Sequence, residues 1–359
     1  SPELFTRELR TAGKPGAILV TSLMTYWYPG VVETIRMAKA VYPDVPVILG
    51  GIYARLCRDH ARSHSGADHV ITSPDVDLLL DTFKDLGIVP PLPDPPIEGP
   101  AYPAFDRLSR IDYVCLQTGS GCPYRCRYCA SGFLNPTLVR RSPEAVLAEI
   151  LHWHRAFGVR DFAFYDDALL VNSQNHAALF LEALRRHRLP IRFHTPNALH
   201  VREITPHTAR LMFDAGFKTI RLGLETADLT LHEALDQKIG RGDFERAVSH
   251  LLKAGFEPKD VGAYILIGLP DQSIGSILET LRLVEKSGAT PFLAEYSPLP
   301  HTPLWEKAVH VSPYDIEADP LFHNNTLLPC WDVDRKQALP HLKQRVVEIR
   351  RDLRTGDRG

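Results

Sequence analysis

Three cysteines lie close together in a short segment rich in small residues, Gly119 to Gly132, which reads GSGCPYRCRYCASG. Glycine lets a loop turn tightly, so the thiols of Cys122, Cys126 and Cys129 can face one region. A 4Fe–4S cluster is normally bound by four cysteine thiolates. Three cysteines therefore predict a cluster with one iron left open to an outside ligand.

Two other metal sites fit part of this pattern. A structural zinc site needs a fourth ligand, and the nearest histidines, His152 and His154, fall within a predicted helix. Cys115, seven residues before Cys122, would complete a four-cysteine cluster for electron transfer. Cys115 lies in an apolar run typical of a strand, however, where a free cysteine usually behaves as a small buried hydrophobe.

Length and charge limit the class of protein. A chain of 359 residues is long enough for two domains. The 41 basic and 43 acidic residues are well mixed and give a net charge of −2, so we expect no nucleic-acid patch. The six cysteines do not suggest a disulfide framework, and no apolar run of about 18 residues is present. We therefore expect a cytoplasmic protein without a membrane span.

Residues 1–88 predict a small parallel sheet of the Rossmann kind. A helix pattern covers about 30–41, and Ser1 and Asp75 stand where helix caps are expected. Short apolar runs of the buried-strand type lie at 17–20, 46–49 and 69–72. The order is therefore β-α-β-β-α. Seven prolines between 89 and 103 predict a semi-rigid linker, which we place at 89–108.

Residues 109–303 predict a second, larger domain. Six apolar runs alternate with helical patterns, at 113–117, 162–165, 191–194, 219–225, 263–267 and 291–296. This order predicts a parallel sheet of βαβ units, closed or partly closed, with ligands at the carboxyl ends of the strands. Residues 304–359 predict a helical extension, in which Cys330 is interpreted as a buried or incidental thiol.

The cysteine segment resembles the CxxxCxxC signature of the radical S-adenosylmethionine (radical SAM) superfamily, with the aromatic Tyr128 directly before the last cysteine. The resemblance implies an α/β fold, a partial (β/α)6 barrel over 109–303, in which Cys122, Cys126 and Cys129 bind a 4Fe–4S cluster. In the family the open iron chelates S-adenosylmethionine, and the reduced cluster cleaves it to a 5′-deoxyadenosyl radical. The resemblance also implies a separate electron donor such as flavodoxin or ferredoxin.

Two strand ends resemble places where the family binds the methionine part of S-adenosylmethionine. Asp166 and Asp167 follow the second strand, and one of them would accept hydrogen bonds from the ammonium group. Asn197 follows the third strand and would reach the same part of the cofactor. The alternative for all three is an ordinary turn role, because loops favour Asp and Asn for local hydrogen bonding.

The fourth and fifth strands resemble the family's ribose and adenine segments. Arg221 and Glu225 share one face of a strand, because side chains alternate with a period of two. Glu225 would accept hydrogen bonds from the ribose, and Arg221 would meet the methionine carboxylate, with a mutual ion pair as the alternative. Leu266 and Gly268 would lie against the adenine, although the family's terminal glutamate is not reproduced after Pro270.

Residues 1–88 resemble part of the cobalamin-binding domain that precedes many radical SAM domains. Thr21 to Leu23 is similar to that domain's SxL segment, and Gly50-Gly51 is similar to its GG turn. The aromatic residues 26–28 after the first strand could pack on the corrin. The chain has no D-x-H-x-x-G, and the sheet lacks the domain's first βα unit. We expect an incomplete cobalamin-binding-like domain that binds cobalamin weakly or not at all.

These patterns predict a radical SAM enzyme whose 5′-deoxyadenosyl radical abstracts hydrogen from an unidentified substrate. One alternative is a cobalamin-dependent radical SAM methyltransferase. An alternative of another class is a non-catalytic iron–sulfur or electron-transfer protein. No sequence feature selects the substrate, and no further catalytic residue is identified.

Overall fold

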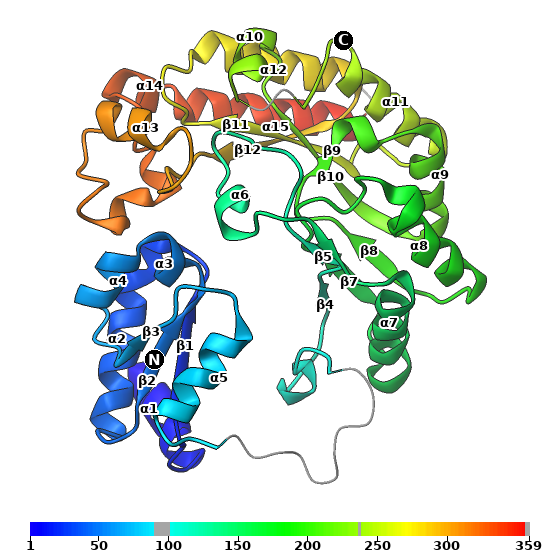
Figure 1. Cartoon of the computed structure of the whole chain (residues 1–359). Helices are drawn as coiled ribbons and strands as arrows, with labels where there is room; N and C mark the ends of the chain where they lie inside the picture. The colour runs from blue at the N-terminus through cyan, green and yellow to red at the C-terminus, as the bar shows by residue number, and fades with distance from the viewer. Residues whose placement is uncertain (90–100, 236–237, 356–359) are drawn as a thin grey trace. The chain divides into compact units, whose positions relative to one another are not determined.

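The computed structural model describes residues 1–89, 101–235 and 238–355 (Figure 1). The chain divides into two compact units. Unit 1 comprises Ser1–Ala101 and Ser297–Cys330, and unit 2 comprises Tyr102–Tyr296 and Trp331–Gly359. Most of the predicted linker, 90–100, lies outside the described residues. None of the described helices has the length and apolarity that a membrane span requires.

Unit 1 contains a parallel sheet of three strands, in the order β1-β2-β3. The strands are β1 (Ile18–Ser22), β2 (Val47–Gly50) and β3 (His69–Val70). The helices are α1 (Pro2–Thr11), α2 (Tyr28–Val41), α3 (Gly51–Leu56), α4 (Arg58–His64) and α5 (Val76–Asp85). Ser1 and Asp75 cap α1 and α5 through their side chains, as predicted.

The predicted order of unit 1 was wrong in one respect, because α3 and α4 lie between β2 and β3. These helices are only six and seven residues long, too short to show a clear helical period. Gly51 begins α3 with a φ of +86°, and a Cβ there would lie 2.3 Å from Thr21 Oγ1. Only glycine therefore allows α3 to start this close to the end of β1.

The segment 297–330 packs with the N-terminal part of the chain. It contains α13 (Trp305–Val311) and the 3-10 helices η5 (Pro320–His323) and η6 (Asn325–Leu327). His323 Nδ1 lies 2.9 Å from Thr25 Oγ1, and Tyr26 donates a hydrogen bond to Asn325. The sequence predicted one extension over 304–359, whereas the structure divides this region between the two units.

Unit 2 contains the barrel sheet, in which six parallel strands follow the order β12-β11-β10-β8-β7-β4. These are β4 (Val114–Leu116), β7 (Asp161–Phe164), β8 (Arg192–His194), β10 (Phe217–Glu225), β11 (Val261–Ile267) and β12 (Thr290–Glu295). A short strand, β9 (Leu199–His200), also pairs with β10. The six predicted strands and the predicted fold class, an α/β partial barrel with a Rossmann-like region before it in the chain, are confirmed.

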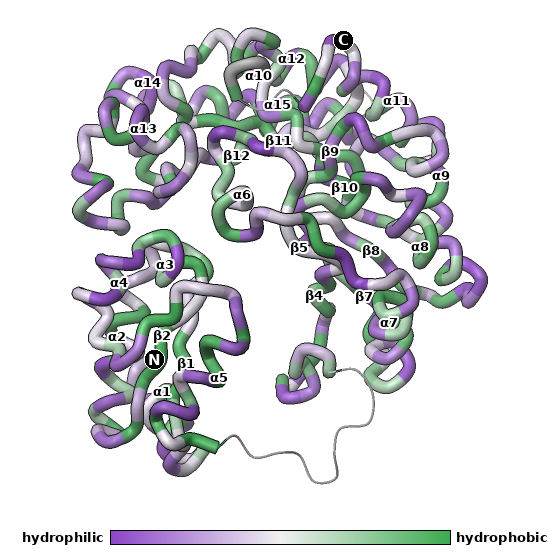
Figure 2. The backbone as a smooth tube through the Cα atoms, in the orientation of Figure 1, coloured by the Kyte–Doolittle hydropathy of each residue, from purple (hydrophilic) through white to green (hydrophobic). Residues whose placement is uncertain are grey.

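Helices follow the strands along the chain and carry apolar faces. They are α7 (Pro143–Phe157), α8 (Ala177–Arg186), α9 (Pro206–Ala215), α10 (Leu229–Leu235), α11 (Asp243–Ala254), α12 (Ile274–Ser287), α14 (Val333–Gln337) and α15 (Leu339–Thr355). Figure 2 shows α11 alternating between hydrophilic and hydrophobic colours, as expected for a helix with one buried face.

Aromatic side chains form the core between the sheet and its helices. Phe164 packs against Phe193 on the next strand and against Phe180 on α8, with ring centroids 5.2 and 6.0 Å apart. Side chains alternate along a strand, so Asp161 and Ala163, which alternate on β7 with Phe162 and Phe164, face the other side of the sheet. That other side carries the polar residues considered below.

Candidate functional site

The cysteine loop is supported by a small antiparallel pair, β5 (Gly119–Ser120) with β6 (Val139–Arg140), and leads into α6 (Ser131–Leu134). Gly121 has a φ of +83°, and a Cβ there would lie 2.3 Å from the carbonyl oxygen of Thr137. Glycine is therefore required for the loop to leave β5 at this point. Cys122 and Cys126 are buried and Cys129 is half-buried.

His200 and Lys238, from outside the loop, contact residues of the cysteine loop. The Nε2 atom of His200, at the end of β9, is 3.8 Å from the Cys122 sulfur. The ring of Tyr124 stacks on His200, with centroids 4.5 Å apart. Lys238 donates a hydrogen bond of 3.0 Å to the Tyr128 hydroxyl. Tyr124 lies within the cysteine motif, whereas nothing in the sequence marks Lys238 or His200, since β9 was not among the predicted strands.

The donor set of three cysteine thiols on one short loop fits a 4Fe–4S cluster. Burial raises the pKa of the Cys122 thiol, and the positive charge of Lys238 opposes this rise. Across the described ranges, no three His, Cys, Asp or Glu side chains are placed to hold a single metal ion, as a zinc tetrahedron requires. A 4Fe–4S cluster places each thiolate on a separate iron, so the sulfurs need not meet at one point.

Cys115 does not lie in the cysteine loop. It belongs to β4, where the Tyr165 side chain lies close enough to act on its thiol. Burial raises the pKa of this thiol. The contact with Tyr165 gives Cys115 a partner of its own and does not support a four-cysteine cluster.

The two adjacent aspartates after β7 have different surroundings. Asp166 is buried, and its carboxylate accepts hydrogen bonds from the amides of Thr118 and Gly119 at 2.9 and 2.8 Å and from the Thr118 hydroxyl at 2.6 Å. The half-buried Asp167 accepts one hydrogen bond of 2.9 Å from Ser131. Its negative charge acts on Cys122, whose pKa it raises in addition to burial. Asp166 thus holds the start of the cysteine segment, whereas Asp167 bonds to Ser131 at its end.

Glu225 ends β10 in an unusual backbone conformation. Its φ is +63°, and the strand register shifts between Gly223 and Glu225. A positive φ outside glycine costs about 1–3 kcal/mol and is kept where surrounding structure enforces it. The carboxylate folds back over the strand, since a Cβ at Gly223 would lie 3.1 Å from Glu225 Oε1.

The other predicted cofactor residues also lie at strand ends. Asn197 donates a hydrogen bond of 2.8 Å to the Tyr165 carbonyl, next to the aspartate pair. Leu266 is buried near the end of β11, and Gly268 follows that strand with a φ of +90°. The buried Gln272 donates a hydrogen bond of 2.7 Å to the Leu266 carbonyl. Gln272 was not singled out from the sequence, and it stabilises the turn that presents Gly268.

Arg221 lies apart from these strand ends. It precedes Glu225 by four residues, or about 13 Å along an extended strand. Its guanidinium lies over the Phe292 ring, 4.2 Å from the centroid. Arg221 lines a cavity of about 470 Å³ on the polar side of the barrel sheet.

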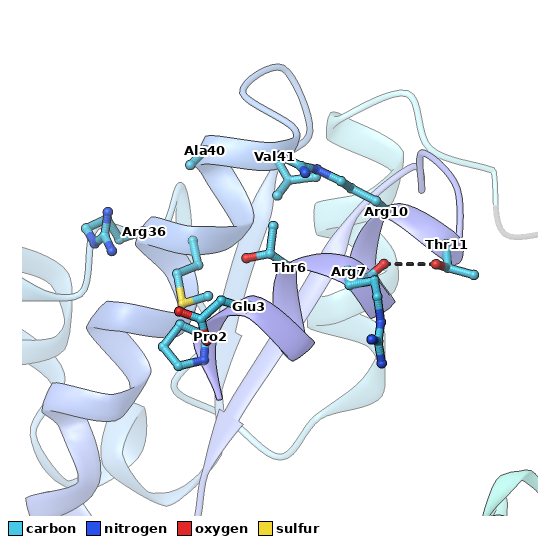
Figure 3. Close-up of a pocket in the computed structure, with 10 residues that line it drawn as sticks. Pro2, Glu3, Thr6, Arg7, Arg10, Thr11, Arg36, Ala40 and Val41 are labelled. Atoms are coloured by element: carbon cyan, nitrogen blue, oxygen red, sulfur yellow. Dashed lines mark hydrogen bonds between the residues drawn. The ribbon is translucent and has the colours of Figure 1, made fainter.

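A second cavity, of about 690 Å³, lies in unit 1 between α1 and α2 (Figure 3). Pro2, Glu3 and Thr6 on α1 and Ala40 and Val41 on α2 line it. Its lining contains no cysteine or histidine. It includes no residue of the predicted cofactor sites.

The end of β1 in unit 1 bears on the predicted cobalamin resemblance. Leu23, Met24 and Trp27 follow this strand and are 62, 41 and 53% exposed. The Tyr26 hydroxyl donates a hydrogen bond to Asn325, and the Tyr28 ring stacks on the Tyr53 ring with their centroids 5.8 Å apart. Of the three aromatic residues considered for corrin packing, Trp27 therefore remains exposed.

Comparison with known proteins defines the class. Residues 116–284 match the radical SAM superfamily, so the chain contains a radical SAM domain. Members of this superfamily bind a 4Fe–4S cluster and S-adenosylmethionine, which agrees with the donor set of the cysteine loop.

Within this class, the chain is similar to proteins named as methyltransferases. It is 26% identical over 304 residues to the uncharacterized methyltransferase sll1242 of Synechocystis sp., covering 81% of this chain and 55% of that protein. The chain spans about half the length of the curated relatives it matches first.

Two solved proteins share the fold. The radical S-adenosylmethionine methyltransferase TsrM from Kitasatospora setae aligns with a TM-score of 0.70 at 17% identity, over 87% of this chain and 69% of that chain. TsrM has also been solved with cobalamin and a 4Fe–4S cluster bound. The cobalamin-dependent S-adenosylmethionine radical enzyme OxsB aligns with a TM-score of 0.60 at 13% identity, over 82 and 47% of the two chains.

Proposed function

We propose that this chain is the catalytic part of a cobalamin-dependent radical SAM methyltransferase. The observation that carries the proposal is the combination, in one chain, of a three-cysteine loop on a partial barrel and a parallel-sheet unit whose first strand ends in exposed apolar side chains. The relatives named as methyltransferases and the fold shared with cobalamin-bound proteins support it. These similarities favour methyl transfer, which was an alternative from the sequence, over the main prediction from the sequence, which was hydrogen abstraction without cobalamin.

The cysteine loop and the strand ends would hold the first two cofactors. Cys122, Cys126 and Cys129 would bind the cluster, and Asp167 would accept hydrogen bonds from the ammonium group of S-adenosylmethionine. Lys238, near Tyr128 and Cys122, is better placed than Arg221 to meet the methionine carboxylate. Glu225 would accept hydrogen bonds from the ribose, with its carboxylate held at the end of β10.

The end of β1 would hold cobalamin through apolar contact. Leu23, Met24 and Trp27 expose enough apolar surface to pack on a corrin, and a large ligand can be held by such contacts. The sequence has no D-x-H-x-x-G motif to provide an axial histidine. The residues at the end of β1 would therefore hold a corrin whose cobalt has no ligand from that motif. When bound, the cluster supplies an electron for cleavage of S-adenosylmethionine and cobalamin supplies a carrier for a methyl group.

Corrin retention tests the proposal. Anaerobically reconstituted protein is incubated with hydroxocobalamin, desalted, and examined by its visible spectrum. We expect near-stoichiometric retention, in place of the weak or absent binding expected from the sequence. We further expect S-adenosylhomocysteine alongside 5′-deoxyadenosine after the cluster is reduced in the presence of S-adenosylmethionine. No retained corrin, with 5′-deoxyadenosine formed and no S-adenosylhomocysteine, would instead support hydrogen abstraction.

A matched pair of variants locates the corrin contact. Leu23→Asp places a charge in the proposed apolar surface and should weaken corrin binding about tenfold, because an ion loses hydration there without a partner. Val347→Asp changes a residue of similar exposure, 57%, on α15 of unit 2. This control should retain corrin like the wild type. Equal retention by both variants would exclude the end of β1 as the contact.

A further inference from the structure

The cavity that Arg221 lines belongs to the barrel sheet alone. It has a volume of about 470 Å³, enough for a small organic molecule. Along the strands, the residues that line the cavity alternate with the phenylalanines of the buried core, so the two sets face opposite sides of the sheet. The lining residues within the strands are Asp161 and Ala163 on β7, His194 on β8, Thr219 and Arg221 on β10, and Tyr264 on β11.

Arg221 brings a positive charge to this cavity without a carboxylate partner. Its guanidinium donates a hydrogen bond of 2.9 Å to the Ile220 carbonyl, lies over Phe292, and interacts with the Tyr264 hydroxyl. Within the described part of the chain, no Asp or Glu forms an ion pair with it. The side chain is half-buried, and burial lowers its pKa. A partly desolvated cation of this kind is stabilised when an anion pairs with it.

The acidic residues of the lining are already paired. Asp161 accepts hydrogen bonds from Arg192 Nε at 2.6 Å and from His194 Nε2 at 3.0 Å. Asp112 pairs with Arg110 at the exposed side of the cavity. Arg221 therefore carries the uncompensated charge of this lining.

The position of Arg221 separates it from the cofactor side. The cysteine loop, Asp167 and Glu225 all lie at the carboxyl ends of the strands, whereas Arg221 lies in the middle of β10. Lys238 already places a cation beside the cysteine loop. Arg221 is thus available to a ligand in the cavity that it lines with Tyr264 and His194.

We propose that this cavity binds the substrate through an anionic group, a carboxylate or a phosphonate or phosphate, which pairs with the Arg221 guanidinium. Arginine suits this role because its planar fork can donate two parallel hydrogen bonds to such a group. Tyr165, Tyr264 and His194 form aromatic walls that suit a planar organic body. The assignment rests on the proposed function, since it names the substrate class for the same barrel.

Calorimetric titration of the full reconstituted chain tests this assignment. The probes are 3-phenylpropionate, phenylphosphonate and the neutral 3-phenylpropanamide. We expect an anion to bind more tightly than the amide, and the preferred anion distinguishes a carboxylate from a phosphonate substrate. Arg221→Gln should weaken anion binding at least about tenfold, the loss expected for a charge-assisted hydrogen bond, and should leave amide binding unchanged.

Arg350→Gln is the matched control. Arg350 lies over the same Phe292 ring, 4.1 Å from its centroid, but hydrogen bonds to the Pro291 carbonyl and does not line the cavity. The anion affinity of the Arg350→Gln variant should stay within about twofold of the wild type, as expected when the changed residue does not touch the ligand. Melting temperatures of both variants show whether a loss reflects unfolding.

The outcomes separate this inference from the proposed function. Titration needs no reductant and no turnover, so anion binding without methyl transfer would count against the proposed function alone. The inference is overturned if neither anion binds the wild type, or if both variants lose the anion equally. It is also overturned if Arg221→Gln loses affinity for S-adenosylmethionine and not for the anion, because Arg221 would then hold the methionine carboxylate.

Discussion

The carboxylate of Asp166 accepts hydrogen bonds from both the amide and the hydroxyl of Thr118, at 2.9 and 2.6 Å. This contact joins the end of β7 to the residue just before β5 and the cysteine loop. Burial raises the pKa of Asp166, and the hydrogen bonds from Thr118 and Gly119 oppose the rise. Asp166 is therefore a positioning residue, which acts on the cluster through the loop.

Removal of this carboxylate should loosen the cysteine loop. Asp166→Ala leaves the buried Thr118 amide and the half-buried Gly119 amide without their acceptor, at a cost of about 1–3 kcal/mol for a buried unpaired donor. We expect a lower melting temperature and fewer irons per chain after reconstitution, measured by calorimetry and iron analysis.

The neighbouring aspartate provides the control. Asp167→Asn keeps an acceptor for Ser131 and should change the free energy of unfolding by no more than about 0.5 kcal/mol, as for most surface changes. The cluster should form normally, while binding of S-adenosylmethionine weakens. If Asp166→Ala reconstitutes as well as Asp167→Asn, the positioning role is wrong.

The three loop cysteines should each be needed for the cluster. Wild-type protein is expected to bind about four irons per chain, and Cys122→Ala, Cys126→Ala and Cys129→Ala should each lose the visible absorption. Cys115→Ala removes a thiol that lies beside Tyr165, outside the cysteine loop, and should retain the full visible absorption of the cluster. Full absorption in Cys126→Ala, or its loss in Cys115→Ala, would show that the ligands are assigned incorrectly.

Local patterns predicted the elements that depend on nearby residues. Ser1 caps α1 and Asp75 caps α5 through their side chains, as the sequence predicted. The parallel strands could be predicted because buried strands of this kind are short, nearly continuous apolar runs. The cysteine spacing likewise marks the loop without knowledge of its surroundings.

Contacts between distant residues could not be predicted in this way. Thr25 and His323 meet in unit 1 although they are 298 residues apart in the chain, and nothing local to either residue marks the pairing. Alternation placed Arg221 and Glu225 on one face of a strand, yet it could not show that Phe292 and a cavity surround Arg221. The differing partners of Asp166 and Asp167 depend on Thr118 and Ser131, which no pattern around the aspartates indicates.

The packing of segment 297–330 in unit 1 should depend on pH through His323. His323 is 1% exposed, and its Nε2 lies 2.8 Å from the Ile316 carbonyl. Nε2 must therefore donate, and Nδ1 accepts from the Thr25 hydroxyl. Burial lowers the pKa of His323 from 6.5 to about 4, while Asp319 opposes this shift and His60 adds to it.

The sign of the effect follows from this depressed pKa. Below pH 6.5 the unfolded chain binds a proton at His323 that the folded chain does not bind, so stability falls as pH is lowered toward about 4. The loss should reach about 3 kcal/mol, at 1.36 kcal/mol per pH unit. Urea unfolding of the wild type and of His323→Gln, followed at pH 7 and pH 4.5, measures it. The variant should be less stable at pH 7, where the hydrogen bonds of His323 are lost, and should lose less stability on acidification. Equal losses in the two proteins would show that other groups, and not His323, determine the acid sensitivity of unit 1.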